Sequence, residues 1–187
     1  MTHILNTPLT KEDLAKMTAG DTAYLSGVIY TARDAAHARL CTALENNEEL
    51  PVDLKNQVVF YAGPAPAPPG MPTGSIGPTT SGRMDAYTPQ LLKYGVLATI
   101  GKGERNAQVI QAIAETGSVY FAAIGGCAAH MAACITKCDV VAYDDLGPES
   151  IKRLTVKDLP LICAVDSKGQ DAYAMGKEKY LQEQKSV

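Results

Sequence analysis

Short stretches in which apolar residues alternate with polar ones, or follow one another directly, recur along the chain, as in TAYLSGVIY, QVVFY and VLATI. Such stretches predict strands, because successive side chains of a strand point to opposite faces of a sheet. We expect strands at residues 22–30, 57–61, 96–100, 118–123, 139–143 and 160–165.

Between these strands the apolar residues recur at the spacing of a helix. Ala36, Leu40 and Leu44 follow one another at four-residue intervals, and Val109 and Ile113 lie on one stripe. This spacing places the side chains on a single helix face. We expect helices at residues 33–46, 82–94, 104–116 and 126–136. Strands that alternate with helices predict an α/β fold.

The length of 187 residues fits a single domain, residues 1–187, with its own hydrophobic core. The net charge of −3 argues against a nucleic-acid partner, because such proteins usually carry a basic face. No apolar run reaches the roughly 18 residues of a membrane span, and the opening residues MTHILNTPLTKEDL lack the apolar centre of a signal peptide. We therefore expect a cytoplasmic protein that does not enter a membrane.

The cysteines are odd in number, which predicts free thiols in a chain without a secretion signal: Cys41, Cys127, Cys134, Cys138 and Cys163. Three of them could be cluster ligands, but the gaps between them hold six and three residues: Cys127, Cys134 and Cys138. Common zinc and iron–sulfur sites use a tighter spacing of two. Buried apolar thiols are the favoured interpretation over cluster ligands, and we expect this chain to bind no metal by itself.

Residues 62–80, AGPAPAPPGMPTGSIGPTT, are rich in proline and glycine and have neither helical nor strand periodicity. A linker between two domains is one interpretation, and a long functional loop of one domain is the other. Too few strands precede this segment to form a domain. We therefore expect a Pro/Gly-rich loop that arches over a site.

Cationic residues occur where predicted strands and helices meet. Arg33 begins a helix, Arg83 ends the turn GPTTSG, and Lys102 lies between two glycines after a strand. Loops at strand ends are where α/β domains build sites, and arginine forks suit carboxylates. These cations predict a site for a small dicarboxylate or phosphate, whereas Asp34, with other charged residues, is assigned to the solvated surface.

The glycine pair Gly125-Gly126 precedes a predicted helix and could admit an anion at its N-terminus. Close packing of that helix on the sheet explains the pair equally simply and is favoured.

The segments TARDAAHARL (31–40), GPTTSGRMDAY (77–87) and GKGERN (101–106) resemble the beta subunit, or C-terminal domain, of class I fumarate hydratases and related tartrate dehydratases. The later segments AIGGCAAHMAA and VVAYDDLGPESI are similar to the same family, so the resemblance runs from about residue 4 to residue 172. The sequences TARDAAH and SGRMD resemble those of the fumarases more closely than those of the tartrate enzymes.

This resemblance implies a swivelling β/β/α domain that pairs with a separate alpha subunit. In the family that partner holds a [4Fe–4S] cluster through three cysteines and leaves one iron open as a Lewis acid. The implied assembly is a hetero-oligomer, for which α2β2 is one arrangement, and its substrate is a small dicarboxylate. The implied reaction is the reversible hydration of fumarate to (S)-malate, catalysed only together with the alpha subunit. An L-tartrate dehydratase beta subunit and a stand-alone carboxylate-binding domain are the alternatives.

By match to the family motifs, Arg33, Arg83 and Lys102 would bind the carboxylate or hydroxyl groups of the substrate, and Thr79 would transfer the proton. Capping of the following helix is the structural alternative for Thr79, although Thr80 or Ser81 fits a cap better.

Several other residues could take part in acid–base or redox chemistry. His37 follows Arg33 by one helical turn and could orient it or reach the substrate, whereas His130 on an alanine-rich segment suits packing or partner contact. Neither histidine is assigned a catalytic role. Cys127 departs from the small non-thiol residue expected at its position in the family, which could make the protein sensitive to oxidation.

Overall fold

A seven-stranded sheet forms the centre of the computed structural model, which describes residues 1–185. Its strands are β1 (Thr2–Asn6), β2 (Thr22–Thr31), β3 (Val58–Phe60), β4 (Ala98–Gly101), β5 (Val119–Ala122), β6 (Ile135–Ala142) and β7 (Ile151–Val165). Neighbouring strands from β1 to β5 run parallel, and β7 runs antiparallel to β2, β5 and β6.

The long strand β7 closes this sheet on itself. One edge of β7 pairs with β2 from Lys152 to Ile162, and its other edge pairs with both β6 and β5. The strands β2, β3, β4, β5 and β7 therefore form a small barrel-like arrangement within a mixed α/β fold, and β1 and β6 extend it at the two ends.

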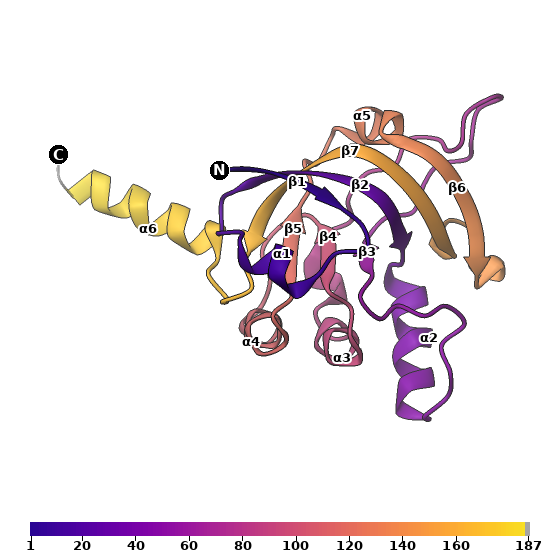
Figure 1. Cartoon of the computed structure of the whole chain (residues 1–187), viewed down its shortest axis with the longest axis horizontal. Helices are drawn as coiled ribbons and strands as arrows, with labels where there is room; N and C mark the ends of the chain where they lie inside the picture. The colour runs from indigo at the N-terminus through magenta and orange to yellow at the C-terminus, as the bar shows by residue number, and fades with distance from the viewer. Residues whose placement is uncertain (186–187) are drawn as a thin grey trace.

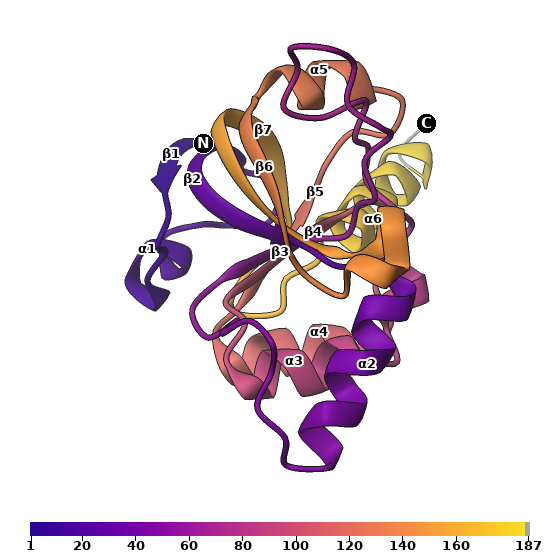
Figure 2. The same ribbon diagram turned by 90° about the vertical axis from the view of Figure 1, so that its right-hand side faces the viewer.

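Helices cover the sheet on different sides (Figures 1 and 2). They are α1 (Lys11–Ala15), α2 (Asp34–Glu45), α3 (Thr88–Tyr94), α4 (Ala107–Thr116), α5 (Ala128–Ala133) and α6 (Ala172–Lys185), with short 3-10 helices η1 (Ser81–Met84) and η2 (Asp144–Glu149). Helices α2, α3 and α4 lie together on one side of the sheet, α5 lies on the other, and α6 extends away from the body.

Two clusters of buried apolar side chains hold these layers together. One lies within the curved sheet and includes Leu25, Ile29 and Phe121. The other joins the sheet to α2, α3 and α4 and includes Leu40 and Ile113. The two clusters correspond to the two faces of the central strands, which explains why those strands are apolar throughout.

All the predicted strands are confirmed, and so is the α/β class. The sequence pattern missed β1, α1 and α6, and β7 begins at Ile151 rather than near residue 160. The predicted helix at 126–136 is shorter, because Ile135 and the residues after it form β6. Gly117 ends α4 in the left-handed conformation, with a φ of 69°, as a helix stop requires.

The predicted helix at 82–94 is wrong as one continuous element. The chain instead forms η1, then turns, and begins α3 at Thr88. Pro89 lies in the first turn of α3. A proline inside a continuous helix would lose a backbone hydrogen bond and clash with the preceding turn, whereas in a first turn it is tolerated.

The proline-rich segment between β3 and η1 contains no helix or strand. It folds back on itself, because Ala65 N donates to Ser75 O and Gly74 N donates to Ala65 O. Ile76 N also donates to Ala128 O at 3.2 Å, so the loop is fastened to α5.

None of the helices within residues 1–185 combines the length and the apolar character that crossing a membrane requires.

Candidate functional site

The turn that carries Thr79 lies beside the strand end that carries Lys102. Thr79 N donates to Tyr61 O at 2.7 Å, Lys102 N donates to Thr79 O at 3.2 Å, and Ser81 N donates to Lys102 O at 2.8 Å. These bonds extend the parallel pairing of β3 and β4 by one bridge, between Thr80 and Lys102. The structure thus brings Thr79 and Lys102 together through their backbones.

Gly101 allows this close approach. A Cβ atom at Gly101 would collide with the side chains of Ser81 and Tyr61. The Ser81 hydroxyl occupies the space and lies 2.9 Å from the hydroxyl of Tyr120, which donates to Gly103 O at 2.8 Å. Ser81 therefore anchors the turn to the sheet.

The proposed capping role of Thr80 or Ser81 is wrong. Thr80 stands at the start of η1, but its side chain makes no capping hydrogen bond, and the side chain is exposed. Ser81 is directed to Tyr120 instead. The amide of Ser81 donates to Lys102 O and that of Arg83 to Thr80 O, so these two amides already have backbone acceptors.

Arg33 and Arg83 meet around Asp34. Oδ1 of Asp34 lies 2.8 Å from Nη2 of Arg83, and its Oδ2 lies 3.3 Å from Nε of Arg33. Asp34 is therefore not a solvated surface residue, because its carboxylate bridges the two cations. An intervening carboxylate lets two guanidinium groups stay close without net repulsion.

Glu149 from η2 completes this cluster. Its Oε1 lies 3.3 Å from Nη2 of Arg33, and its Oε2 accepts a hydrogen bond from Ala35 N at 2.8 Å. Arg33 stands at the cap position of α2 and supplies no capping bond, so Glu149 does so from a distant segment. A carboxylate is well placed there because the N-terminus of a helix is partly positive.

A buried ion pair lies beneath these groups, and the sequence interpretation missed it. Nε of Arg105 donates to Oδ1 of Asp85 at 2.7 Å, and its Nη2 donates to Thr88 Oγ1 at 2.7 Å. Asp85 also accepts from Asn106 N at 2.9 Å. The pair joins the segment of Arg83 to the segment of Lys102. One feature of the sequence could have indicated this pair: Asp85 lies in the segment 77–87 and Arg105 in the segment 101–106, and both segments carry proposed site residues.

Aromatic rings enclose the Arg105 guanidinium. Its carbon lies 5.3 Å from the ring centre of Tyr61 and 4.8 Å from that of Tyr120. The side chain of Arg105 is fully buried. Burial also raises the pKa of the Tyr120 hydroxyl well above its usual range, so this hydroxyl stays neutral. The cation is held by stacking as well as by charge.

The side chain of Lys102 reaches toward the turn after β5. A Cβ atom at Gly125 would lie 3.5 Å from Cδ of Lys102 and 3.8 Å from its Nζ. The glycine pair therefore borders the candidate site. The helix that follows, α5, starts at Ala128 and has six residues.

His37 lies inside the protein behind Arg33. Its Nδ1 is 3.1 Å from Arg33 O, and its ring contacts Tyr61 edge-on. Among residues 1–185, no hydrogen-bond partner reaches its Nε2. Burial lowers the pKa of His37 to about 4, so the ring is neutral near pH 7. Of the two roles considered, this geometry fits support of the Arg33 backbone. His130 is exposed on α5.

The cysteines are free thiols, as predicted. The expectation that Cys127, Cys134 and Cys138 are buried is wrong, because all three are half-buried, with Cys134 and Cys138 packed against the edge of the core. Burial raises the pKa of Cys41 to about 11 and that of Cys163 to about 12. Within residues 1–185, no three His, Cys, Asp or Glu side chains converge as metal ligands would.

Residues 2–176 match the family described as Fumarase C-terminus. The chain is 41% identical over 171 residues to a putative L(+)-tartrate dehydratase subunit beta of Methanocaldococcus jannaschii, and the match covers 88% of each protein. It is also 41% identical over 174 residues to the anaerobic class I fumarate hydratase of Escherichia coli (strain K12), covering 90% of this chain. Fumarate hydratase 2 of Leishmania major is 38% identical over 174 residues, covering 91% of this chain. The chain spans 32% and 31% of these two fumarate hydratases, respectively.

Proposed function

Because this chain belongs to the Fumarase C-terminus family, we propose that it is the beta subunit of an iron–sulfur hydro-lyase that converts fumarate reversibly to (S)-malate. The observation that carries the proposal is the convergence of Arg33 and Arg83 on one carboxylate, Asp34. Asp34 holds two guanidinium groups close together, and guanidinium groups bind carboxylates in a two-pronged geometry. Such a pair is therefore suited to a dicarboxylate substrate.

A separate alpha subunit is the second part of the proposal. One relative is named as a subunit beta, and the fumarate hydratases extend well beyond the matched third of their length. We propose that an alpha subunit supplies the remaining part, in a hetero-oligomer such as α2β2. The [4Fe–4S] cluster would be held by this alpha subunit, because the cysteine spacing of this chain differs from the tight spacing of common iron–sulfur sites.

Removal of water from malate requires the loss of a proton from the carbon next to one carboxylate and the departure of the hydroxyl from its neighbour. The carboxylate next to the deprotonated carbon gains negative charge in the transition state. Arg33, Arg83 and Lys102 would stabilise that charge, because preorganised cations are most effective where charge develops. The open iron of the partner would act as a Lewis acid toward the departing hydroxyl.

Thr79 is the proposed proton-transfer residue of this chain. A threonine hydroxyl is a weak base at its ordinary pKa and needs a nearby cation or carboxylate to act. The backbone bond from Lys102 N to Thr79 O supports the proposal, because it brings a cationic residue beside Thr79. Thr79 is half-buried, so a substrate atom could reach its hydroxyl.

The Pro/Gly-rich loop would close over the substrate, and the domain would swivel against the alpha subunit. Fastening of the loop to α5 through Ile76 supports a defined closed position. Proline also limits the conformational entropy that an ordered loop loses.

A tartrate dehydratase beta subunit is the second candidate. The match to the relative of that name covers 88% of both proteins, and its identity equals that of the bacterial fumarate hydratase. The same cations suit fumarate, malate and tartrate. A stand-alone carboxylate-binding domain, which never meets an alpha subunit, is the third.

Anaerobic co-expression with a cluster-bearing alpha subunit, followed by a substrate panel, tests these candidates. We expect the two chains to co-purify and to interconvert fumarate and (S)-malate faster than they dehydrate L-tartrate. Preference for L-tartrate would establish the second candidate. Failure of any alpha subunit to bind, with retained carboxylate binding by this chain alone, would establish the third.

A further inference from the structure

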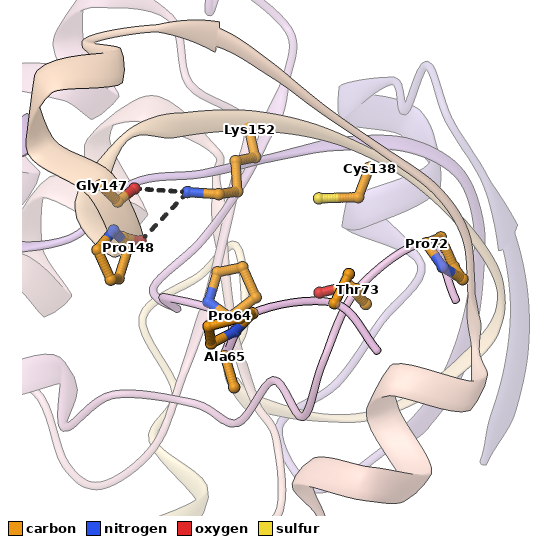
Figure 3. A pocket seen from close by; sticks show the side chains of 10 residues that line it. Pro64, Ala65, Pro72, Thr73, Cys138, Gly147, Pro148 and Lys152 are labelled. Atoms are coloured by element: carbon orange, nitrogen blue, oxygen red, sulfur yellow. Dashed lines mark hydrogen bonds between the residues drawn. The ribbon is translucent and has the colours of Figure 1, made fainter. Parts of the chain in front are cut away.

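A pocket of about 280 Å³ lies between the Pro/Gly-rich loop and strands β6 and β7 (Figure 3). Loop residues such as Pro64, Ala65 and Pro72 form its apolar wall. Thr73, Cys138 and Lys152 supply its polar groups. The arginines and Lys102 of the candidate active site do not line it.

Lys152 is a buried cation whose partners in the described residues are neutral. Its side chain donates to Gly147 O at 2.9 Å, to Ser150 Oγ at 2.5 Å and to Pro148 O at 3.4 Å. The residue is 8% exposed, and burial lowers the pKa of its ammonium group. Cys138 and, after it, Asp144 oppose this lowering of the pKa. The partners that Lys152 bonds within residues 1–185 are two carbonyl oxygens and a hydroxyl, and none is a carboxylate. A buried charge without a counter-charge favours an anion beside it.

Thr73 is the second observation that points to a ligand. It is 3% exposed, and its hydroxyl forms no hydrogen bond of ordinary geometry within residues 1–185. Its neighbour in the pocket is the thiol of Cys138, which is only a weak hydrogen-bond partner. Figure 3 shows this hydroxyl and the Cys138 sulfur directed into the space between the loop and Lys152. Buried hydroxyls are normally paired, so an unpaired one that faces a pocket is suited to a ligand atom.

We propose that this pocket is a second ligand site, which binds a small monocarboxylate with a short aliphatic chain. The ammonium group of Lys152, which Figure 3 shows directed at Gly147 and Pro148, would turn toward the space that Thr73 Oγ1 faces. The carboxylate would then accept hydrogen bonds from Lys152 Nζ and Thr73 Oγ1, and the chain would lie on the proline wall. The 3.4 Å contact to Pro148 O is the longest of the three that Lys152 makes, so its proton is the one available to a ligand.

The chemistry of the walls selects against a doubly charged ligand. One ammonium group neutralises one carboxylate, and a second carboxylate would face proline and alanine without a partner. Burial of an unpaired charge against apolar groups is strongly unfavourable. The pocket therefore differs in ligand class from the dicarboxylate site around Arg33 and Arg83.

The experiment uses the full chain and butyrate as the probe, with binding followed by calorimetry and by NMR shifts. We expect saturable binding, with resonances of the loop and of β7 perturbed. Lys152→Met should weaken binding by at least about tenfold, because the charge-assisted bond is lost. Thr73→Val, which keeps the shape, should weaken it by about threefold or more. Arg83→Lys is the matched control and should leave the butyrate affinity unchanged.

The proposal is overturned if butyrate does not saturate, if Thr73→Val binds it as well as the wild type, or if succinate binds in this pocket more tightly than butyrate. Equal weakening by Arg83→Lys would place butyrate at the other site and also overturn it. Lys152 holds η2 in place, so circular dichroism must show that its variant folds; if it does not, Thr73→Val decides. Because the assay needs no alpha subunit and no turnover, it is independent of the proposed hydro-lyase activity.

Discussion

Oδ1 of Asp34 lies 2.8 Å from Nη2 of Arg83, and this contact joins the first residue of α2 to the η1 turn. The same carboxylate contacts Arg33. Two proposed substrate-binding arginines, from segments far apart in the chain, are thus held at one place by a residue that does not belong to the proposed substrate-binding set.

Asp34→Asn should lower kcat/KM of the assembled enzyme by about tenfold, mainly through a higher KM, because the arginines lose the charge that positions them. Steady-state kinetics with (S)-malate measures this effect. Asp145→Asn is the matched control. Asp145 forms an exposed ion pair with Arg39, which lies in α2 as Asp34 does. A lower KM in Asp34→Asn would mean that Asp34 competes with the substrate instead.

Arg83→Lys should impair the assembled enzyme although the charge is kept. A lysine cannot reproduce the two-pronged geometry of a guanidinium group. We expect a loss of about 1.5–3 kcal/mol of transition-state binding, roughly ten- to a hundredfold in kcat/KM. Arg39→Lys, in an exposed pair with Asp145, should be silent. Wild-type kinetics in Arg83→Lys would remove Arg83 from the substrate site.

Thr79→Val should lower kcat by about 10²–10⁴ with a smaller change in substrate affinity, if Thr79 transfers the proton. Thr80→Val is the matched control. Because the Thr80 side chain makes no capping bond and is exposed, this variant should change stability by less than about 0.5 kcal/mol. Both variants must bind the alpha subunit before rates are compared. Near-normal dehydration of malate by Thr79→Val would falsify the assignment.

Asp85→Asn should destabilise the isolated chain by about 3–5 kcal/mol, because it leaves the fully buried Arg105 charge without its partner. Urea unfolding followed by circular dichroism measures the loss. Asp13→Asn, which alters an exposed pair with Lys16 and the capping box of α1, should have a much smaller effect. Equal effects of the two variants would show that the Arg105 pair contributes no more than a surface contact.

The stability of the chain should fall as the pH decreases from about 6.5 to about 4, in part because of His37. Burial lowers the pKa of folded His37 to about 4, below the value of about 6.5 expected after unfolding. The unfolded state therefore binds the proton first, and each pH unit in this window removes up to about 1.4 kcal/mol.

His37→Gln should reduce this slope, and His130→Gln, at an exposed position of α5, is the matched control variant. Urea unfolding at several pH values provides the measurement. An unchanged slope in His37→Gln would mean that His37 does not titrate differently in the folded and unfolded states.

The amino-acid sequence by itself determined the local elements and the residues at their ends. Strand and helix periodicity located the strands from β2 to β7 and helices such as α2 and α4, because these patterns depend on neighbours along the chain. The same reasoning placed Arg33, Arg83 and Lys102 at junctions. The prediction of one helix over 82–94 is wrong because Pro89 lies in the first turn of a new helix, α3.

Only the tertiary structure decided which of these residues meet. Asp34 lies between two arginines, Glu149 caps a helix to which it does not belong, and Asp85 pairs with Arg105. A single sequence does not encode these pairs as a spacing, because residues distant in the chain are brought together by the packing of the helices and by the closure of β7 against β2 and β5. The energy of an ion pair depends on the distance between its two charges. Folding of the sheet and packing of the helices bring these charges within a few ångströms of each other.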